Sequence, residues 1–435
     1  MNGRRTGERR DQGAGRALRP AFAALAAAAV LTFALSAPAP PAAAVVIVDH
    51  AGGGDYDNIQ AGVDAASEGD TVLVYPGTYD GPGDHDIEFG AKNVVLRSRD
   101  GAVATIIHNA YGAGHRLLRF FDGGQDTTCV VDGFTLKHGS IVGATDSGGG
   151  AISVDGVSNP PGPKFVNLVI EYNYGWHGGG VYVNSPEDAA RPVFRSCVFR
   201  GNTATNNGGA IYCGTGAEPR VYDCTFEDNE SASGMGGGVH CNLRSDAEVA
   251  RCLFDGNTAG ARGGALSAWR SDIVVTECTL VGNSSQDVGG AVSCRGDCSP
   301  LFSNLTVARS SANGEGGAVW VMDESTPVFQ NTIVAFTEDA RGDAVACDAT
   351  GAPTFDTCCV FGNHGGDALC GAASNIIYQN PEFCNLDAGD LTLAATSPCL
   401  PPGNPYASRI GAHDEGCSNP AVRPVTWGLV KFLHR

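Results

Sequence analysis

Apolar and polar residues alternate in a short segment that recurs along the chain from residue 149 onward. Seven copies begin with a glycine pair, and an eighth, degenerate copy begins with Gly-Asp. In each copy the fourth and sixth residues are Ile, Val, Leu, Cys or Ala, and the fifth is Ser, Tyr, His, Trp or Ala. This period of two predicts a half-buried strand. The copies start 26 to 30 residues apart, at Gly149, Gly178, Gly208, Gly236, Gly263, Gly289, Gly316 and Gly342.

A second motif keeps the same interval. A strand such as Phe194–Phe199 ends in Cys-x-Phe, and an asparagine follows three residues after its last apolar residue. The asparagine suits a tight left-handed corner. The asparagines in this position are Asn173, Asn202, Asn229, Asn257, Asn283 and Asn363.

A unit of about 27 residues with two or three short strands has no way to bury its own apolar face, whereas stacked units do. No segment between the repeats has the pattern of a crossover helix, which argues against a leucine-rich horseshoe or a βαβ fold. The repeat therefore predicts an all-β, single-stranded parallel β-helix, a solenoid whose turns are about 4.8 Å apart. The glycine content, 61 of 435 residues, fits this fold. Each pair marks a corner that needs positive φ or a close approach to the next turn.

Residues 45–148 are expected to form an N-terminal cap and the first turns. Asp57 is a candidate helix N-cap, and Ile59, Val63 and Ala66 lie on one helical face. Such an amphipathic helix covers the open apolar end of a solenoid. Repeats then occupy 149–370, a C-terminal coil or cap 371–417, and a tail 418–435. The segment 426–435 fits either a sorting tail of an exported protein or a short amphipathic helix that closes the last turn.

The first 44 residues have the order of a secretory signal. Six arginines between Arg4 and Arg19 precede an apolar run over 21–35, and three alanines offer a cleavage site before Val45. The run is shorter than the roughly 20 residues of a membrane-spanning helix, and no later stretch has the length to span a bilayer as a helix. We therefore expect a secreted, extracellular or cell-surface protein, with outer-membrane association as one form of display.

The chain is acidic. Its formal net charge is −19, and loss of residues 1–44 would leave 22 basic and 45 acidic residues, a net charge of −23. Such a surface repels phosphate backbones, so nucleic acid is excluded as a partner. We expect a monomer that attracts divalent cations. No other cofactor is indicated.

Several segments resemble known families. Gly54–Gln60, Gly69–Val74 and Pro76–Tyr79 resemble the opening of pectin-lyase-fold proteins, and the Gly-Gly-Ala-Ile and Phe-x-x-Asn repeats resemble those of chlamydial-type polymorphic outer-membrane proteins. The segment from Asn380 to Cys399 is similar to the closing segment of secreted bacterial right-handed β-helix proteins. The resemblance implies a right-handed parallel β-helix over about residues 45–417. It also implies a possible enzyme for acidic polysaccharides, although the motifs of polygalacturonase-like and pectate-lyase-like enzymes are absent from the sequence.

The fifth position of the repeat is the candidate ligand face. Tyr182, Tyr212 and His240 fall on three consecutive turns, and Trp320 occupies the same position further on. Because the neighbours of these residues on the same face of the strand are Ala or Gly, we expect a flat floor on which a sugar ring could lie. The alternative is ordinary aromatic packing between neighbouring strands.

Acidic residues follow the same strand in turn after turn. Asp246, Asp272 and Asp297 are candidate Ca²⁺ ligands. Their offsets drift between turns, so a solvated edge that keeps the protein soluble is the alternative. Lys137 and His138 are interpreted as exposed residues of an early corner.

All 16 cysteines follow residue 44, which suits disulfides outside the cytoplasm. Three pairs are eleven residues apart: Cys213 with Cys224, Cys241 with Cys252, and Cys347 with Cys358. Disulfides within a turn are one interpretation. A ladder of disulfides between turns and reduced core residues are the others.

Taken together, these patterns favour an exported β-helix protein that is adhesin-like or contacts a glycan without catalysis. A polysaccharide lyase or hydrolase acting on an acidic polysaccharide is the second hypothesis, and a purely structural surface protein is the third.

Overall fold

The computed structural model describes residues 43–142, 148–186, 189–338, 341–406 and 408–418. The chain divides into a unit of residues 1–42 and a unit of residues 43–435, and the described residues all belong to the second. The predicted signal segment, apart from its last two residues, and the tail segment 426–435 lie outside the described residues.

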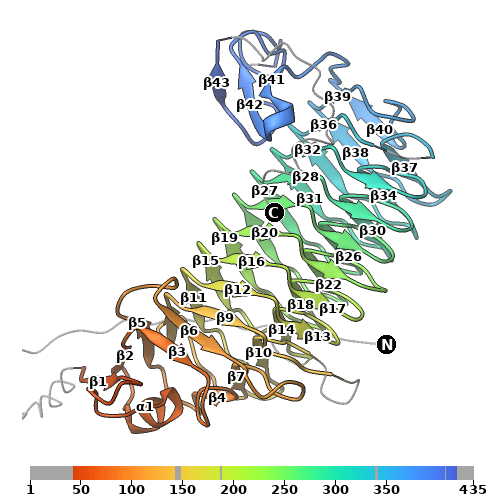
Figure 1. The fold of residues 1–435 in the computed structure, drawn as a ribbon. Coiled ribbons are helices and arrows are strands. Elements are labelled where there is room, and N and C mark those ends of the chain that lie inside the picture. The colour runs from red at the N-terminus through yellow and green to blue at the C-terminus, as the bar shows by residue number, and fades with distance from the viewer. Residues whose placement is uncertain (1–42, 143–147, 187–188, 339–340, 407, 419–435) are drawn as a thin grey trace, which may run out of the picture. The chain divides into compact units, whose positions relative to one another are not determined.

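One turn of the second unit shows how the repeat folds. Its strands are β15 (Val193–Arg195), β16 (Val198–Arg200), β17 (Thr203–Ala204) and β18 (Ile211–Cys213). Each pairs in parallel with its equivalent in the next turn. The predicted stack of short strands, a parallel β-helix, is therefore confirmed (Figure 1).

Stacking produces four parallel walls, which we name sheets A to D. Sheet A contains β1 (Val45–Val48), β2 (Thr71–Val74), β5 (Val95–Ser98), β8 (Val130–Asp132), β11 (Lys164–Val166), β15, β19 (Arg220–Tyr222), β23 (Glu248–Ala250), β27 (Val274–Thr276), β31 (Leu301–Ser303), β35 (Val328–Gln330), β38 (Thr354–Asp356) and β40 (Ala372–Ser374). Sheet B contains β3 (Gly77–Tyr79), β6 (Thr105–His108), β9 (Thr135–Lys137), β12 (Val169–Glu171), β16, β20 (Thr225–Glu227), β24 (Leu253–Asp255), β28 (Thr279–Val281), β32 (Thr306–Ala308), β36 (Ile333–Ala335) and β39 (Cys359–Phe361).

The glycine-pair strands form sheet C, and the short strands that precede the glycine pairs form sheet D. Sheet C contains β4 (Ile87–Glu88), β7 (Leu118–Phe121), β10 (Ile152–Asp155), β14 (Val181–Asn184), β18, β22 (Val239–Asn242), β26 (Leu266–Trp269), β30 (Val292–Arg295), β34 (Val319–Val321) and β37 (Val345–Cys347). Sheet D contains β13 (Tyr174–Gly175), β17, β21 (Glu230–Ser231), β25 (Thr258–Ala259), β29 (Ser284–Ser285) and β33 (Ser311–Ala312).

The core lies inside the turns and is built from equivalent side chains in contact. Phe199, Phe226 and Phe254 are fully buried, and their rings stack in register at centroid distances of 4.7 and 4.5 Å. Offset stacking of this kind adds to the free energy of burying the rings. The inward position of each strand was predicted by the period-two pattern.

The glycine pairs form the corners that lead into sheet C, as predicted. Gly208 has a φ of 71°, in the left-handed region that favours glycine. At Gly209 an added Cβ would lie 2.2 Å from the carbonyl oxygen of Gly237 on the next turn. Both reasons given for the pair, positive φ and close approach, therefore apply, each to a different glycine.

The repeated asparagines do not occupy the left-handed corners, so that prediction is wrong. Positive φ falls on the preceding residue, for example Asp228 at 51°, while Asn229 itself is fully buried. The side chains form a ladder in which each Nδ2 donates to the Oδ1 of the next turn at 2.9 to 3.0 Å. This asparagine ladder consists of Asn173, Asn202, Asn229, Asn257 and Asn283. It satisfies backbone groups that the corner would otherwise bury without partners.

The predicted N-terminal helix is α1 (Ile59–Ala65), which lies at the first turns beside β1 and β4 (Figure 1). Ile59, Val63 and Ala66 are buried as expected. The N-cap is Asn58 and not Asp57, because the Asn58 side chain accepts from the amide of Ala61.

The C-terminal segment forms a small sheet of β41 (Phe383–Asn385), β42 (Asp390–Ala394) and β43 (Glu415–Cys417), with the 3-10 helix η1 (Leu386–Ala388). Its apolar residues, Leu393 and Ile410 among them, pack on Ala308, Ile333 and Ala335, which belong to strands of sheet B. The alternation of buried and exposed residues is accordingly lost in β32 and β36, where all three residues are buried.

Candidate functional site

The aromatic residues of the fifth position do stack on consecutive turns. Tyr182 pairs in register with Tyr212, and Tyr212 with His240. The ring centroids lie 5.4 and 5.7 Å apart, with interplanar angles of 6° and 24°.

The expected flat, exposed floor is nevertheless absent. The exposed fractions of Tyr182, Tyr212 and His240 are 9%, 7% and 0%. Rings in register cover one another, and His177 stacks on Tyr212 at 4.4 Å. These three side chains therefore offer no ring face to a sugar, and the alternative of aromatic packing between strands describes them. Trp320 is half-buried.

His240 stays neutral in this stack. Burial, with a smaller contribution from the nearby His177, lowers the pKa of His240 to about 3, and neither ring nitrogen has a hydrogen-bond partner. Burial also lowers the pKa of His177 to about 4. In the unfolded chain both imidazoles titrate near pH 6.5. Their contribution to stability is complete above that pH and is lost as the pH falls toward 3, because the unfolded chain then binds the protons.

We therefore expect His240→Phe to match or exceed the wild type in stability at pH 7 and to lose less stability between pH 6.5 and 4. The substitution removes the protonation penalty of one imidazole, whose limit is about 1.4 kcal/mol per pH unit. Urea unfolding midpoints at pH 7, 6, 5 and 4 measure the effect. His364→Phe, at an exposed histidine, is the matched control. Equal pH slopes in wild type and His240→Phe contradict the assignment.

The acidic row follows the ends of the sheet C strands and forms one side of a groove of about 770 Å³. Backbone hydrogen bonds join successive turns along this row. The amides of Arg244, Arg270 and Asp297 donate to carbonyls of the next turn at 2.7, 2.9 and 2.7 Å. The groove is lined by Arg244, Asp246, Trp269, Arg270, Asp272, Arg295, Gly296, Asp297, Asp323, Glu324 and Thr350.

Trp269 is the aromatic residue of this groove. It is the last residue of β26, is half-buried, and pairs in register with Arg295 of β30. The guanidinium of Arg295 lies 5.5 Å from the Trp269 ring centroid and also binds Asp323 at 2.7 Å. Gly296 lies beside the indole, where a Cβ would come within 2.8 Å of a ring carbon. Sequence reasoning missed Trp269 because it took the fifth position as outward, whereas the seventh position, at the strand end, is the accessible one.

The three candidate calcium ligands lie in or beside this groove but do not converge. Asp246 accepts the backbone amide of Asp272 at 3.0 Å, and Asp272 accepts that of Ser299 at 2.6 Å. Both carboxylates thus hold neighbouring turns together, and their ligand atoms do not gather with that of Asp297 within 4.8 Å. Calcium binding by the row stays a prediction.

The cysteines differ from the predicted pairing within turns. Cys347 is bonded to Cys370 and not to Cys358, and a second disulfide joins Cys384 to Cys417. The remaining candidates, Cys213, Cys224, Cys241, Cys252 and Cys358, are buried free thiols. Cysteines eleven residues apart lie on different walls, one in sheet C and one beside sheet B, so the turn itself separates them.

The cysteines beside sheet B are instead reduced and lie in the core, as the third interpretation predicted, and their thiols stack between turns without disulfide bonds. The amide of Cys197 lies 3.4 Å from the Sγ of Cys224, and that of Cys252 lies 3.4 Å from the Sγ of Cys278. Burial raises the pKa of Cys252 well above its usual value. Because these thiols are buried in the core, we interpret them as small packing residues.

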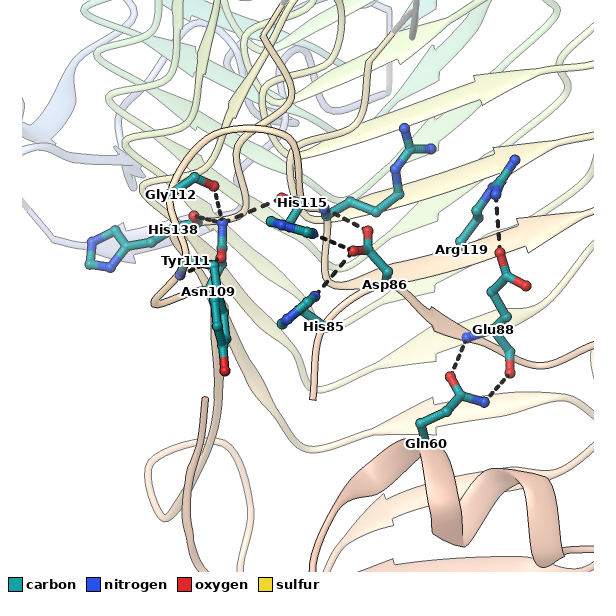
Figure 2. A network of polar contacts seen from close by, with 11 residues as sticks. Gln60, His85, Asp86, Glu88, Asn109, Tyr111, Gly112, His115, Arg119 and His138 are labelled. Atoms are coloured by element: carbon teal, nitrogen blue, oxygen red, sulfur yellow. Dashed lines mark hydrogen bonds and ion pairs between the residues drawn. The ribbon is translucent and has the colours of Figure 1, made fainter. Parts of the chain in front are cut away.

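A third cluster, which the sequence did not suggest, lies in the first turns. His85 and Asp86 precede β4, and His115 precedes β7, the next strand of sheet C. The Oδ2 of Asp86 lies 3.1 Å from the Nδ1 of His85 and 2.7 Å from the Nδ1 of His115 (Figure 2). It is the one group of three His, Cys, Asp or Glu side chains in the described part of the chain whose donor atoms all lie within 4.8 Å.

The carboxylate of this cluster is ionised at neutral pH. Partial burial raises the pKa of Asp86, but hydrogen bonds from His115, His85 and the amide of Arg116 outweigh burial, so the net shift is downward. An ionised carboxylate only accepts hydrogen bonds, so both Nδ1 atoms donate to it. His138, near this cluster in Figure 2, is exposed as predicted.

Similarity to known proteins identifies the fold of this chain and no activity. Residues 150–314 match the family model described as the right handed beta helix region. The solenoid is accordingly the right-handed parallel β-helix that the resemblance implied. No curated protein matches the chain. The resemblance to polymorphic outer-membrane proteins stays a prediction.

Two solved structures are similar at low identity. A mutant of a PL6 family alginate lyase gives a TM-score of 0.40 at 12% identity over 87% of this chain. The alignment covers 59% of the length of that lyase. The endo-xylogalacturonan hydrolase from Aspergillus tubingensis gives 0.34 at 14% identity, over 86% of this chain and 100% of the hydrolase. Neither similarity identifies a ligand or a reaction for this protein. In the described part of the chain, no helix has the length and apolar character needed to cross a membrane.

Proposed function

We propose that this protein is an adhesin-like, non-catalytic β-helix that contacts a glycan in the groove beside β22, β26, β30, β34 and β37. The observation that carries the proposal is Trp269, a half-buried indole in a groove lined mainly by charged side chains. An aromatic face packs against the C–H face of a sugar ring, while carboxylates and guanidinium groups bind hydroxyls. Ligand sites combine apolar contact with a few placed polar groups in this way.

The charge of the groove favours a glycan without acidic sugars. Three arginines and five carboxylates line it, which gives a formal charge of −2. Arg295 is already paired with Asp323, so its positive charge is partly neutralised. An uncharged glycan or one with amino sugars avoids the repulsion that a polyanion would meet. Calcium bridging between the acidic row and an acidic glycan is the one route by which a polyanion would bind.

The length of the groove favours an oligosaccharide over a single sugar. The lining residues come from the ends of five successive sheet C strands, β22, β26, β30, β34 and β37, and the loops after them. Neighbouring parallel strands are about 4.8 Å apart, so five strands span about 19 Å. Because equivalent positions recur at this spacing, the groove presents a row of similar contacts to an extended chain.

Replacing the indole tests the proposal. On an array of neutral, amino-sugar and acidic glycans we expect the wild type to retain neutral or amino-sugar chains. Trp269→Ala is expected to weaken binding at least about tenfold, because buried aromatic residues dominate contact energy. Tyr172→Ala removes a ring that is 53% exposed and outside the groove, and serves as the matched control.

Other outcomes separate the remaining hypotheses. Retention of acidic glycans only when CaCl₂ is present, and its loss in EDTA, would assign the acidic row to calcium and overturn the preference for neutral chains. Release of products from acidic polysaccharides would establish a lyase or hydrolase. Wild-type binding to no glycan on the array would leave a structural surface protein. Export to the cell surface and a monomeric state are parts of the same proposal.

A further inference from the structure

We propose that His85, Asp86 and His115 bind a transition-metal ion, with Zn²⁺ as the ion that their donor atoms suit. The site lies in the first turns of the β-helix and is independent of the groove at Trp269. Two imidazole nitrogens and one carboxylate oxygen form a donor set used for zinc and related divalent ions. Ca²⁺ and Mg²⁺ prefer sets made of oxygens alone.

The donor atoms are already close to the spacing that a metal needs. In a tetrahedral site with bonds of about 2.0–2.1 Å, two ligand atoms lie about 3.3 Å apart. The Oδ2 of Asp86 lies 3.1 and 2.7 Å from the two Nδ1 atoms. A small opening of the cluster would let an ion bind the two Nδ1 atoms that now donate to this oxygen, while the single proton of each neutral imidazole moves from Nδ1 to Nε2.

The backbone holds the two turns together at this point. Asp86 donates its amide to the carbonyl of Arg116 at 2.8 Å, and its Oδ1 accepts the amide of Arg116 at 3.1 Å. Asp86 has a φ of 50°, a left-handed conformation that non-glycine residues adopt only where the surroundings require it. The carboxylate is therefore fixed beside the next turn before any ion binds.

The loop that carries His115 is fixed as well. His115 and Ser140 exchange backbone hydrogen bonds at 3.2 and 2.8 Å. The Nδ2 of Asn109 donates to the carbonyls of Gly112, His115 and His138, and its Oδ1 accepts the amide of Tyr111 (Figure 2). Such anchoring places the imidazole without waiting for the metal, which lowers the ordering cost of binding.

The cluster is also open to solvent on one side. The side chains of His85, His115 and Asp86 are 14%, 38% and 41% exposed. The Tyr111 ring packs against the His85 ring at 4.7 Å, and its hydroxyl points away from the Asp86 carboxylate in Figure 2. Three protein ligands thus leave a coordination position for water or another small ligand.

Zinc binding to the full chain tests the proposal. After removal of metals with EDTA and exchange into metal-free buffer, calorimetric titration with ZnCl₂ is expected to show one Zn²⁺ per chain for the wild type. Titration with CoCl₂ is expected to produce the visible absorption of four-coordinate cobalt. His115→Ala and Asp86→Asn are expected to weaken Zn²⁺ binding about 100-fold.

His364→Ala, which removes an exposed histidine elsewhere, is the matched control and should bind like the wild type. Far-UV circular dichroism of each variant establishes that the β-helix is intact, and Asp86→Asn keeps the size of the side chain where His115→Ala leaves a gap. If the wild type binds no Zn²⁺, or if both variants bind it with unchanged affinity and stoichiometry, the cluster is a hydrogen-bonded triad and the proposal is wrong.

Discussion

Gly209→Ala is expected to destabilise the protein by about 4 kcal/mol or more, which places it among the most damaging single substitutions. The added Cβ would lie 2.2 Å from the carbonyl oxygen of Gly237 and within 2.7 Å of two backbone atoms of Glu230. All these atoms belong to the main chain of the neighbouring turn. Hydrogen bonds of the other walls fix the distance between turns, so the corner has no direction in which to relax. The urea midpoint of unfolding measures the loss.

Gly342→Ala is the control, because Gly342 is the first residue of the degenerate repeat, next to the position equivalent to Gly209, and no main-chain atom crowds it. An added Cβ there would meet only the side chain of Glu315, at 3.5 Å or more. We expect a change within about 0.5 kcal/mol. Similar midpoints for Gly209→Ala and Gly342→Ala would show that the neighbouring turns separate easily, contrary to the fold described above.

Asn229→Ala is expected to cost about 4 kcal/mol as well. Asn229 is fully buried at the centre of the asparagine ladder. Its Oδ1 accepts the amide and the Nδ2 of Asn202, and its Nδ2 donates to the carbonyl of Phe199 at 2.9 Å. Alanine would leave these groups buried without partners and would add a cavity.

Asn313→Ala provides the comparison. Asn313 is exposed and donates its Nδ2 to the side chain of Gln286 at 2.9 Å. Its loss is expected to change the free energy of unfolding by no more than about 0.5 kcal/mol. An equal effect of the two substitutions would mean that the ladder contributes nothing beyond an ordinary surface hydrogen bond.

The sequence predicted the fold well because the repeat records contacts between neighbouring turns. Gly208 and Gly209 recur since every turn meets the same main-chain crowding, and Phe226 recurs since each ring packs on its equivalent. The role of Asn229 was misassigned for the same reason that it recurs. The asparagine recurs at the corners, and we attributed its recurrence to the tolerance of asparagine for a left-handed backbone. It recurs instead because its side chain hydrogen-bonds to the asparagine of the next turn.

The candidate site was predicted less well, because accessibility depends on what covers a strand. Tyr212 alternates correctly and faces away from the core, yet His177 and the neighbouring rings bury it. Trp269 occurs once, so no repeat marks it. His85 and His115 are 30 residues apart, which is about the length of one turn. Aligning the first turns with the later repeats would therefore have predicted that the two histidines lie on neighbouring turns.

Cysteine pairing shows the same limit. The spacing of eleven residues is real, but it records two core positions of each turn and not a bond. The partner of Cys347 is Cys370, which lies beyond the last glycine-pair strand where the repeat no longer applies.

The positions of the two disulfides have a consequence for how the stack opens. Every inner turn is held by a neighbour on each side, whereas a terminal turn has one neighbour and frays first. At one end α1 covers the first turns. At the other, Cys347–Cys370 links the last turns covalently, and Cys384–Cys417 links two strands of the small sheet that packs on sheet B. A reductant would therefore cause local unfolding to begin at the C-terminal turns and to propagate toward the centre of the stack. The thiols of the central turns are already reduced, so the reductant would not change them.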